Sequence, residues 1–160
     1  NETLTSLSLG GGHFCVADLA QSLLHNSTLK NLNLNSNKHV MSLQMEPLAR
    51  TIRLSKALSC VNLAGNFISE EGVWALADAA KINVRLVECR IDTFALGRQH
   101  PALLALQYQL FLNRGRFHEL LLSTKSNIFA LILAQAGDRK FGLDVAYGLL
   151  QNRPDLFCAV

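Results

Sequence analysis

Apolar residues recur along the chain in short blocks of one spacing. The first block is Leu4, Leu7 and Leu9, and four later blocks repeat its L-x-x-L-x-L pattern at intervals of 25, 29, 28 and 31 residues. Alternate side chains of a strand share one face, so each block predicts a short strand with one buried face. The later blocks are Leu29, Leu32 and Leu34; Leu58, Val61 and Leu63; Leu86, Cys89 and Ile91; and, more weakly, Phe117, Leu120 and Leu122.

Helical spacing fills the intervals between the blocks. We expect helices over residues 16–24, 47–54 and 102–112, where apolar residues recur three and four positions apart. Pro47 would then lie in a first helical turn, where proline is tolerated. Another helix is expected after Ser69, a cap-like residue followed by an acidic first turn. The inner stripe of that helix consists of Val73, Leu76, Ala77 and Ala80.

Asparagines mark the turns on both sides of the blocks. Asn37 and Asn66 stand three residues after the second and third blocks, completing the pattern L-x-x-L-x-L-x-x-N of leucine-rich repeats. Asn26 and Asn83 open the Asn-x-x-Leu turns before two blocks, and asparagine suits the turn that ends a helix. One unit of about 28 residues cannot bury its own apolar side, so the units must stack. We predict an α/β fold, a right-handed βα horseshoe segment of a leucine-rich-repeat solenoid, with about five repeats over residues 1–123.

The remaining stretch, residues 124–160, lacks the repeat. Two helices are expected there, and because a terminal repeat exposes an apolar edge unless it is covered, we predict that they form a C-terminal helical cap. A hairpin that docks a partner is the alternative. At the other end the first block has no cap, and the sequence opens on Asn1 rather than on Met. We therefore expect this chain to be part of a longer one, with further repeats upstream.

The side chains between the leucines predict a recognition surface. If Leu32 and Leu34 point inward, their neighbours point outward along the concave surface of the sheet, which we call the strand face. Repeat proteins bind partners on such extended surfaces. The surface begins neutral and rich in amides and ends charged, and its candidate partner-binding residues are Asn31, Asn33, Asn35, Cys60, Asn62, Glu88, Arg90, Asp92 and Glu119.

Composition narrows the class of protein. The chain has 160 residues, 31 of them leucine, and a net charge of +3. Its longest apolar run, residues 128–134, is far shorter than the roughly 18 residues of a membrane span, and no local Lys/Arg cluster would follow a phosphate backbone. We expect neither a membrane nor a nucleic acid as partner. The four cysteines lie far apart, which favours a reducing, cytoplasmic location over a disulfide framework or a zinc site.

Nothing in the sequence predicts catalysis. The run from Gly10 to His13 follows a strand, but it lacks the lysine and the hydroxyl residue of a phosphate-binding loop, so we interpret it as a variant repeat turn. The five histidines have no ligand spacing, and Cys60 has no neighbour in sequence that would activate its thiol. We expect no enzyme activity, no catalytic residue, no metal and no cofactor.

Two segments carry a resemblance to a known family. Residues 26–34 and 61–69 resemble repeats of the ribonuclease-inhibitor type, which occur in NOD-like receptors, in the Ran GTPase-activating protein and in tropomodulin. The run from Asn62 to Leu76 and the later run from Val87 to Asp92 are most similar to the repeat domain of tropomodulin and leiomodin.

The function that follows is a non-enzymatic scaffold for protein–protein interaction on the strand face. The resemblance implies two alternatives: an actin-regulatory module like that of tropomodulin, or a GTPase-activating module that acts on a small GTPase. A structural subunit of a cytoskeletal or ciliary assembly is a third alternative, which fits the expectation that the chain is part of a longer one.

Overall fold

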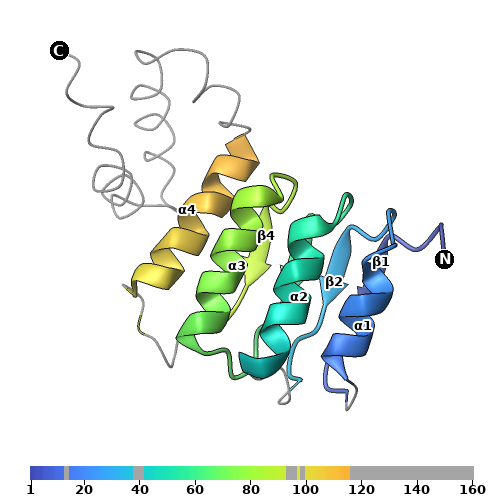
Figure 1. The fold of residues 1–160 in the computed structure, drawn as a ribbon, viewed down its shortest axis with the longest axis horizontal. Helices are drawn as coiled ribbons and strands as arrows, with labels where there is room; N and C mark the ends of the chain where they lie inside the picture. The colour runs from blue at the N-terminus through green and yellow to red at the C-terminus, as the bar shows by residue number, and fades with distance from the viewer. Residues whose placement is uncertain (13–14, 38–41, 93–96, 98–99, 116–160) are drawn as a thin grey trace.

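The described part of the chain forms four strand–helix units that stand side by side (Figure 1). The computed structural model describes residues 1–12, 15–37, 42–92, 97 and 100–115. In chain order the elements are β1 (Ser6–Ser8), α1 (Val16–Leu23), β2 (Asn31–Asn33), α2 (Ser42–Leu54), β3 (Cys60–Asn62), α3 (Glu70–Ile82), β4 (Glu88–Arg90) and α4 (Pro101–Gly115).

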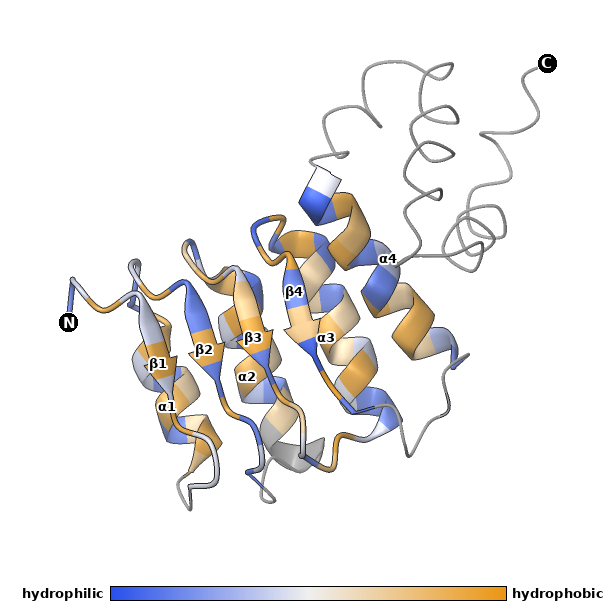
Figure 2. Cartoon of the chain, turned by 180° about the vertical axis from the view of Figure 1, so that it is seen from behind, coloured by the Kyte–Doolittle hydropathy of each residue, from blue (hydrophilic) through white to orange (hydrophobic). Residues whose placement is uncertain are grey.

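The four strands make one parallel sheet in sequence order, β1-β2-β3-β4. The second residue of each predicted block pairs with its counterpart in the next strand, so Leu7, Leu32, Val61 and Cys89 form one inward-pointing row. The helices lie on one face of this sheet and leave the other uncovered by any described element (Figures 1 and 2). The predicted strand phase is therefore confirmed for the first four blocks, in an α/β fold that is leucine-rich-repeat-like.

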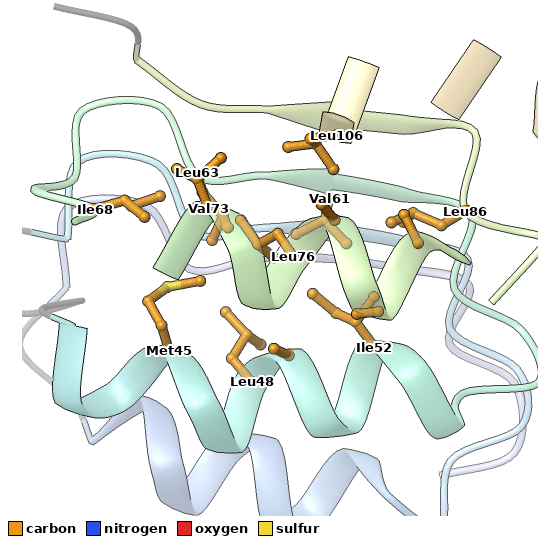
Figure 3. Packing of buried hydrophobic residues seen from close by; sticks show 14 of the residues in the cluster. Met45, Leu48, Ile52, Val61, Leu63, Ile68, Val73, Leu76, Leu86 and Leu106 are labelled. Carbon is orange, nitrogen blue, oxygen red and sulfur yellow. The ribbon is translucent and has the colours of Figure 1, made fainter. Parts of the chain in front are cut away.

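The core lies between the sheet and the helices (Figure 3). Block residues point into it from the strands, and Leu34, Leu63 and Leu86 are completely buried. Side chains of the helices meet them there, including all four of the stripe predicted for α3. Met45, Leu48, Ile52, Val61, Leu63, Val73 and Leu76 belong to this single cluster.

Burial of the first block is less complete than that of the second and third. Leu4 is 40% exposed, whereas its counterparts Leu29 and Leu58 are each 2% exposed. Leu7 and Leu9 are also only partly buried. β1 has a hydrogen-bonded neighbour on one side within the described residues, so its leucines pack against fewer side chains.

Three helices differ from their predicted bounds. α1 ends at Leu23, one residue earlier than expected. α2 begins at Ser42 rather than at Pro47, so Pro47 lies inside the helix and not in its first turn. This start could not be predicted because residues 42–46 carry only a ragged apolar stripe, although Met45 is completely buried. α4 extends one residue earlier than expected, to Pro101, and three residues later, to Gly115. Proline is favoured at the first helical position because an N–H group there would have no acceptor within the helix, so its absence costs nothing.

The predicted cap of α3 is present. The Ser69 hydroxyl oxygen accepts a hydrogen bond from the Gly72 N–H at 3.3 Å, and Glu70 and Glu71 make the first turn acidic. Hydrogen bonds from Ser69 and from its own backbone lower the pKa of the Glu71 carboxyl. At the other end, Asn83 has φ −84° and is not in the left-handed conformation that its proposed role in the turn implied. It shapes the turn with its side chain, whose Oδ1 accepts from the Arg85 N–H at 3.0 Å.

Buried amides tie each unit to the one before it. The Asn37 side chain donates to the carbonyl oxygens of Leu34 and of Leu9 in the preceding repeat, both at 2.9 Å. Asn66 does the same one repeat later, donating to Leu63 at 2.8 Å and to Leu34 at 2.9 Å. These bonds satisfy strand-end carbonyls that would otherwise be buried without a partner.

A second set of bonds joins the other ends of the helices. The Asn83 side chain donates to Ile52 O at 2.8 Å, and the Asn113 side chain donates to Leu86 O at 2.7 Å and Ala80 O at 3.0 Å. In the unit before, the Thr51 hydroxyl donates to Ala20 O at 2.8 Å. Side chains therefore bond to the neighbouring repeat both in the turns that follow the strands and near the ends of the helices.

Several expectations concern segments that the structure does not describe. The fifth block (Phe117, Leu120 and Leu122) and the cap over residues 124–160 lie outside the described residues. Within the described residues, no helix has the length and apolar character needed to cross a membrane.

We predict that Asn66→Ala destabilises the chain by roughly 1–3 kcal/mol. The change removes both hydrogen bonds of a buried side chain. Leu34 O keeps its bond from Asn37, but Leu63 O loses its amide donor, and a buried carbonyl left unpaired costs about 1–3 kcal/mol. Urea unfolding followed by circular dichroism measures the effect. Asn31→Ala is the matched control, because Asn31 is exposed on the strand face and surface substitutions usually change stability by less than about 0.5 kcal/mol. Equal effects of the two changes would contradict the structural role of Asn66.

Candidate partner-binding surface

The strand face consists of two parallel rows of side chains. One row holds Ser6, Asn31, Cys60 and Glu88, and the other holds Ser8, Asn33, Asn62 and Arg90. Because the register pairs equivalent residues, each row crosses all four strands. β1 and β2 carry hydroxyls and amides, β3 carries the Cys60 thiol and the Asn62 amide, and β4 carries charges, so the surface runs from neutral to charged as the sequence predicted.

The side-chain amides of the second row form hydrogen bonds within the chain. Asn33 donates to the Ser8 hydroxyl at 3.1 Å and accepts from the Asn35 N–H at 3.1 Å. Asn62 accepts from the Ala64 N–H at 3.1 Å. These contacts fix the side-chain rotamers, so the amide groups are presented to a partner in a defined orientation. A preordered surface loses less entropy on binding.

The charges of β4 neutralise each other. The Arg90 guanidinium forms an ion pair with the Glu88 carboxylate two residues away on the same strand. Both side chains are exposed enough for solvent to screen the pair, so its contribution to stability is small. A partner would meet a dipole here rather than a net charge.

Asp92 and Asn35 lie just beyond the strands and help to build the turns. The Asp92 carboxylate accepts a hydrogen bond from the Gly65 N–H of the preceding repeat. The Asn35 side chain packs directly over Gly10, where a Cβ atom would lie 2.2 Å from its Oδ1. Both candidate site residues therefore have a structural contact as well as a position at the edge of the strand face.

One turn position is left-handed in three successive repeats. Gly11, Ser36 and Gly65 occupy equivalent places after the strands and have φ values of 69°, 57° and 76°. Glycine adopts this conformation freely, whereas a residue with a Cβ is strained there. In the first turn Gly11 thus has the same backbone conformation as its counterparts. This agrees with the interpretation of the described residues of this turn, 10–12, as a variant repeat turn.

The two described strand cysteines differ in environment. Cys60 is partly exposed on the strand face, and its sulfur accepts from the Ser59 hydroxyl at 3.8 Å. Cys89 points into the core, as predicted. Burial raises the pKa of the Cys89 thiol to about 12, and the nearby Glu88 carboxylate adds to the rise. Cys89 is therefore a protonated, weakly nucleophilic thiol at neutral pH.

The remaining candidate, Glu119, lies outside the described residues. Within the described ranges, no three His, Cys, Asp or Glu side chains come together as a metal site would require. The absence of enzyme activity and of a cofactor remains a prediction from the sequence.

A groove on the helix face was not predicted from the sequence. It lies between α2 and α3 and has a volume of about 680 Å³. Arg50 of α2 lines one wall, and Trp74 and Asp78 of α3 line the other. Trp74 is 41% exposed. Its indole N–H donates to Glu70 at 3.3 Å, and Glu70 in turn lies 3.4 Å from His100, which precedes α4. A lone tryptophan in an amphipathic helix gave no signal of a groove, because the second wall comes from another repeat.

Comparison with known proteins finds similar folds among solved structures but no match by sequence. No protein-family model and no curated protein matches the sequence. Among solved structures, the tropomodulin C-terminal domain of Caenorhabditis elegans is similar with a TM-score of 0.52 and 12% identity, over 78% of this chain and 92% of that domain. The structure of leiomodin-1 Actin-Binding Site 2 is similar with a TM-score of 0.53 and 13% identity, over 74% of this chain and 85% of that one. These similarities show a shared leucine-rich-repeat-like fold.

The turn geometry leads to a paired prediction on stability. Gly65→Ala should destabilise the chain by about 2 kcal/mol, because the new Cβ would be strained at positive φ and would lie 2.8 Å from the Ser36 hydroxyl oxygen. Ser36→Gly should instead stabilise it by roughly 0.5–1 kcal/mol, since it relieves the same strain at the equivalent position. Urea denaturation of both variants gives the two signs. If both changes destabilise equally, left-handed strain is not what distinguishes these positions.

Proposed function

We propose that this chain is a non-enzymatic protein-binding scaffold, and that its strand face holds the partner. The observation that carries the proposal is the pair of polar rows on the face that no described helix covers (Figure 2). Sheet surfaces whose only role is solubility need no fixed side-chain geometry, whereas Asn33 and Asn62 are both held by specific hydrogen bonds.

The finer architecture belongs to the same proposal. We infer a solenoid of the ribonuclease-inhibitor type over residues 1–123, followed by a helical cap over residues 124–160, in a cytoplasmic protein. The inter-repeat bonds of Asn37 and Asn66 and the strand spacing of 25, 29 and 28 residues support the repeat type.

A charge-neutral double substitution tests the strand face. Glu88→Ala combined with Arg90→Ala removes an ion pair whose two members bond to each other, so the fold is expected to persist. The immobilised full chain would be used to capture proteins from a cytosolic extract, followed by quantitative mass spectrometry. We expect the specific partner to be recovered at least about tenfold less with this variant, since charged contacts at interfaces contribute 1.5 kcal/mol or more.

Arg50→Ala combined with Asp78→Ala is the matched control. It also removes one cation and one carboxylate, both exposed, but from the helix face. Recovery should match that of the unaltered chain. A partner that is lost equally from both variants, or only from the control, would place the interface elsewhere.

Actin is the best-supported specific partner. The structure of leiomodin-1 Actin-Binding Site 2 shares this fold, and the segment from Asn62 to Leu76, which forms β3's end, the turn and the start of α3, carries the sequence resemblance. The GTPase-activating and ciliary alternatives gain no support from these neighbours.

The actin hypothesis predicts that the full chain slows elongation at the pointed ends of actin filaments whose barbed ends are capped. Fluorescence of labelled actin measures the rate as the chain is titrated. The Glu88→Ala, Arg90→Ala variant should require about tenfold more protein for the same inhibition. Unchanged elongation at saturating concentrations of the unaltered chain would exclude a tropomodulin-like activity while leaving the scaffold proposal open to the capture experiment.

A further inference from the structure

Exposed cations and aliphatic side chains gather at the edge of the sheet where the helices end. We call this surface the helix-end rim and define it by two consecutive repeats. Its cations are Arg53, Lys56, Lys81 and Arg85, and its aliphatic side chains are Leu54, Ile82 and Val84.

The parallel topology brings these seven residues together. The register pairs Cys60 with Glu88, a shift of 28 residues, so Arg53 corresponds to Lys81 and Leu54 to Ile82. The backbone ties the two turns directly, because the Val87 N–H donates to Ser59 O at 2.8 Å. In Figure 2 the turns that precede the strands follow one edge of the sheet. One cation and one aliphatic side chain of the rim, Arg53 and Leu54, are therefore repeated in the next unit by Lys81 and Ile82.

The aliphatic residues of the rim are exposed to an unusual degree for this chain. Leu54, Ile82 and Val84 are 53%, 55% and 48% exposed, whereas the leucines of the second and third blocks are nearly completely buried. Apolar side chains that gather on the surface among polar ones mark sites of association. The core gives no reason for their position, because the α2 and α3 stripes that face it are filled by other residues.

Among the described residues, no carboxylate is paired with a cation of the rim. Within the described residues, the two side-chain ion pairs are Glu88–Arg90 and Glu70–His100, and neither involves the rim. The carboxylates nearest in sequence are Asp78, one helical turn before Lys81, and Glu88, which is held by Arg90. The rim therefore projects a net positive charge.

The helix dipole explains only part of this pattern. Arg53 and Lys81 lie in the last turns of α2 and α3, where cations are favoured. Lys56 and Arg85 lie beyond the helix ends, where that effect has faded. Lys30 and Arg114 extend the basic character into the adjoining turns, with the Arg114 guanidinium donating to Val87 O at 2.7 Å.

We propose that the helix-end rim binds the surface of bilayers that contain anionic phospholipid. Leu54, Ile82 and Val84 would enter the boundary between headgroups and acyl chains, while the long stems of the neighbouring Lys and Arg keep their charges at the level of the phosphates. A protein interface would instead centre on aromatic residues in a charge-depleted core, and residues 53–57 and 81–85 contain no aromatic side chain. This contact lies along the surface of the membrane and requires no spanning segment, so it revises the expectation, drawn from composition, that no membrane takes part.

Vesicle co-sedimentation tests the proposal with the full chain. We expect the chain to sediment with vesicles of phosphatidylcholine and phosphatidylserine in equal amounts and to remain in the supernatant with vesicles of phosphatidylcholine alone. Binding should weaken steeply as salt is raised, because the Debye length falls to about 3 Å at 1 M. Equal binding to both kinds of vesicle, or no binding at low salt, would overturn the proposal.

A double variant that removes two cations tests the charges of the rim separately from its aliphatic side chains. Lys56→Gln with Arg85→Gln should lower the partition coefficient about thirtyfold, since each cation near an anionic surface contributes about fivefold. Gln21→Glu with Arg50→Gln lowers the net charge equally on the helix face and should have a much smaller effect. A similar loss in both would mean that net charge, not the rim, attracts the chain to the vesicles.

Leu54→Ser with Ile82→Ser should also reduce binding by tenfold or more, because each CH₂ that no longer enters the bilayer lowers the partition coefficient about fourfold. Phe67→Ser is the matched control, since Phe67 is 72% exposed in the turn that follows β3, at the opposite edge of the sheet. Circular dichroism spectra and melting curves establish that the variants are folded. If the aliphatic variant binds like the unaltered chain and soluble polyglutamate displaces both, the rim is a site for acidic protein and the lipid proposal is wrong.

Discussion

The side-chain amides of Asn37 and Asn66 are the contacts on which the array depends most. Each sits at the point where a strand ends and its backbone carbonyls turn toward the core, and each bridges two repeats with one NH₂ group. Apolar packing between the sheet and the helices is roughly indifferent to small shifts along the array, whereas a hydrogen bond is not. These bonds therefore fix the distance and the phase between one repeat and the next, and with them the alignment of the two rows on the strand face.

Much of this fold could be read from the sequence because its signals are local and repeated. Leu29, Leu32 and Leu34 share a spacing with Leu58, Val61 and Leu63, and a spacing that recurs in phase has few structural interpretations. The start of α2 was missed because its first turn carries little periodic signal and Pro47 suggested a later beginning. The conformation of Asn83 was missed for a different reason: an asparagine can end a helix through its backbone or its side chain, and the sequence does not distinguish the two.

The sequence predicts which residues of the candidate site point outward, but not which contacts each of them makes within the protein. Alternation along the strands predicts that Glu88, Arg90 and Asp92 point outward, yet only coordinates show that the first two neutralise each other and that the third holds Gly65. The α2–α3 groove and the helix-end rim were missed altogether, since each joins residues 28 positions apart whose individual characters are ordinary. Surface features of a repeat protein arise between repeats, where the sequence gives the parts and the stacking gives the combination.

The unequal strand intervals of 25, 29 and 28 residues show where such a protein tolerates a change in length. From the first leucine of the second and third blocks to the asparagine that follows, the count is constant, because one added residue would turn every later strand side chain to the wrong face. The variation falls instead in the helical half of each unit and in its connecting segments, which lie against one layer only. Insertions that enlarge the helix side would leave the strand face unaltered, so the two faces of this chain are free to diverge in sequence and length at different rates.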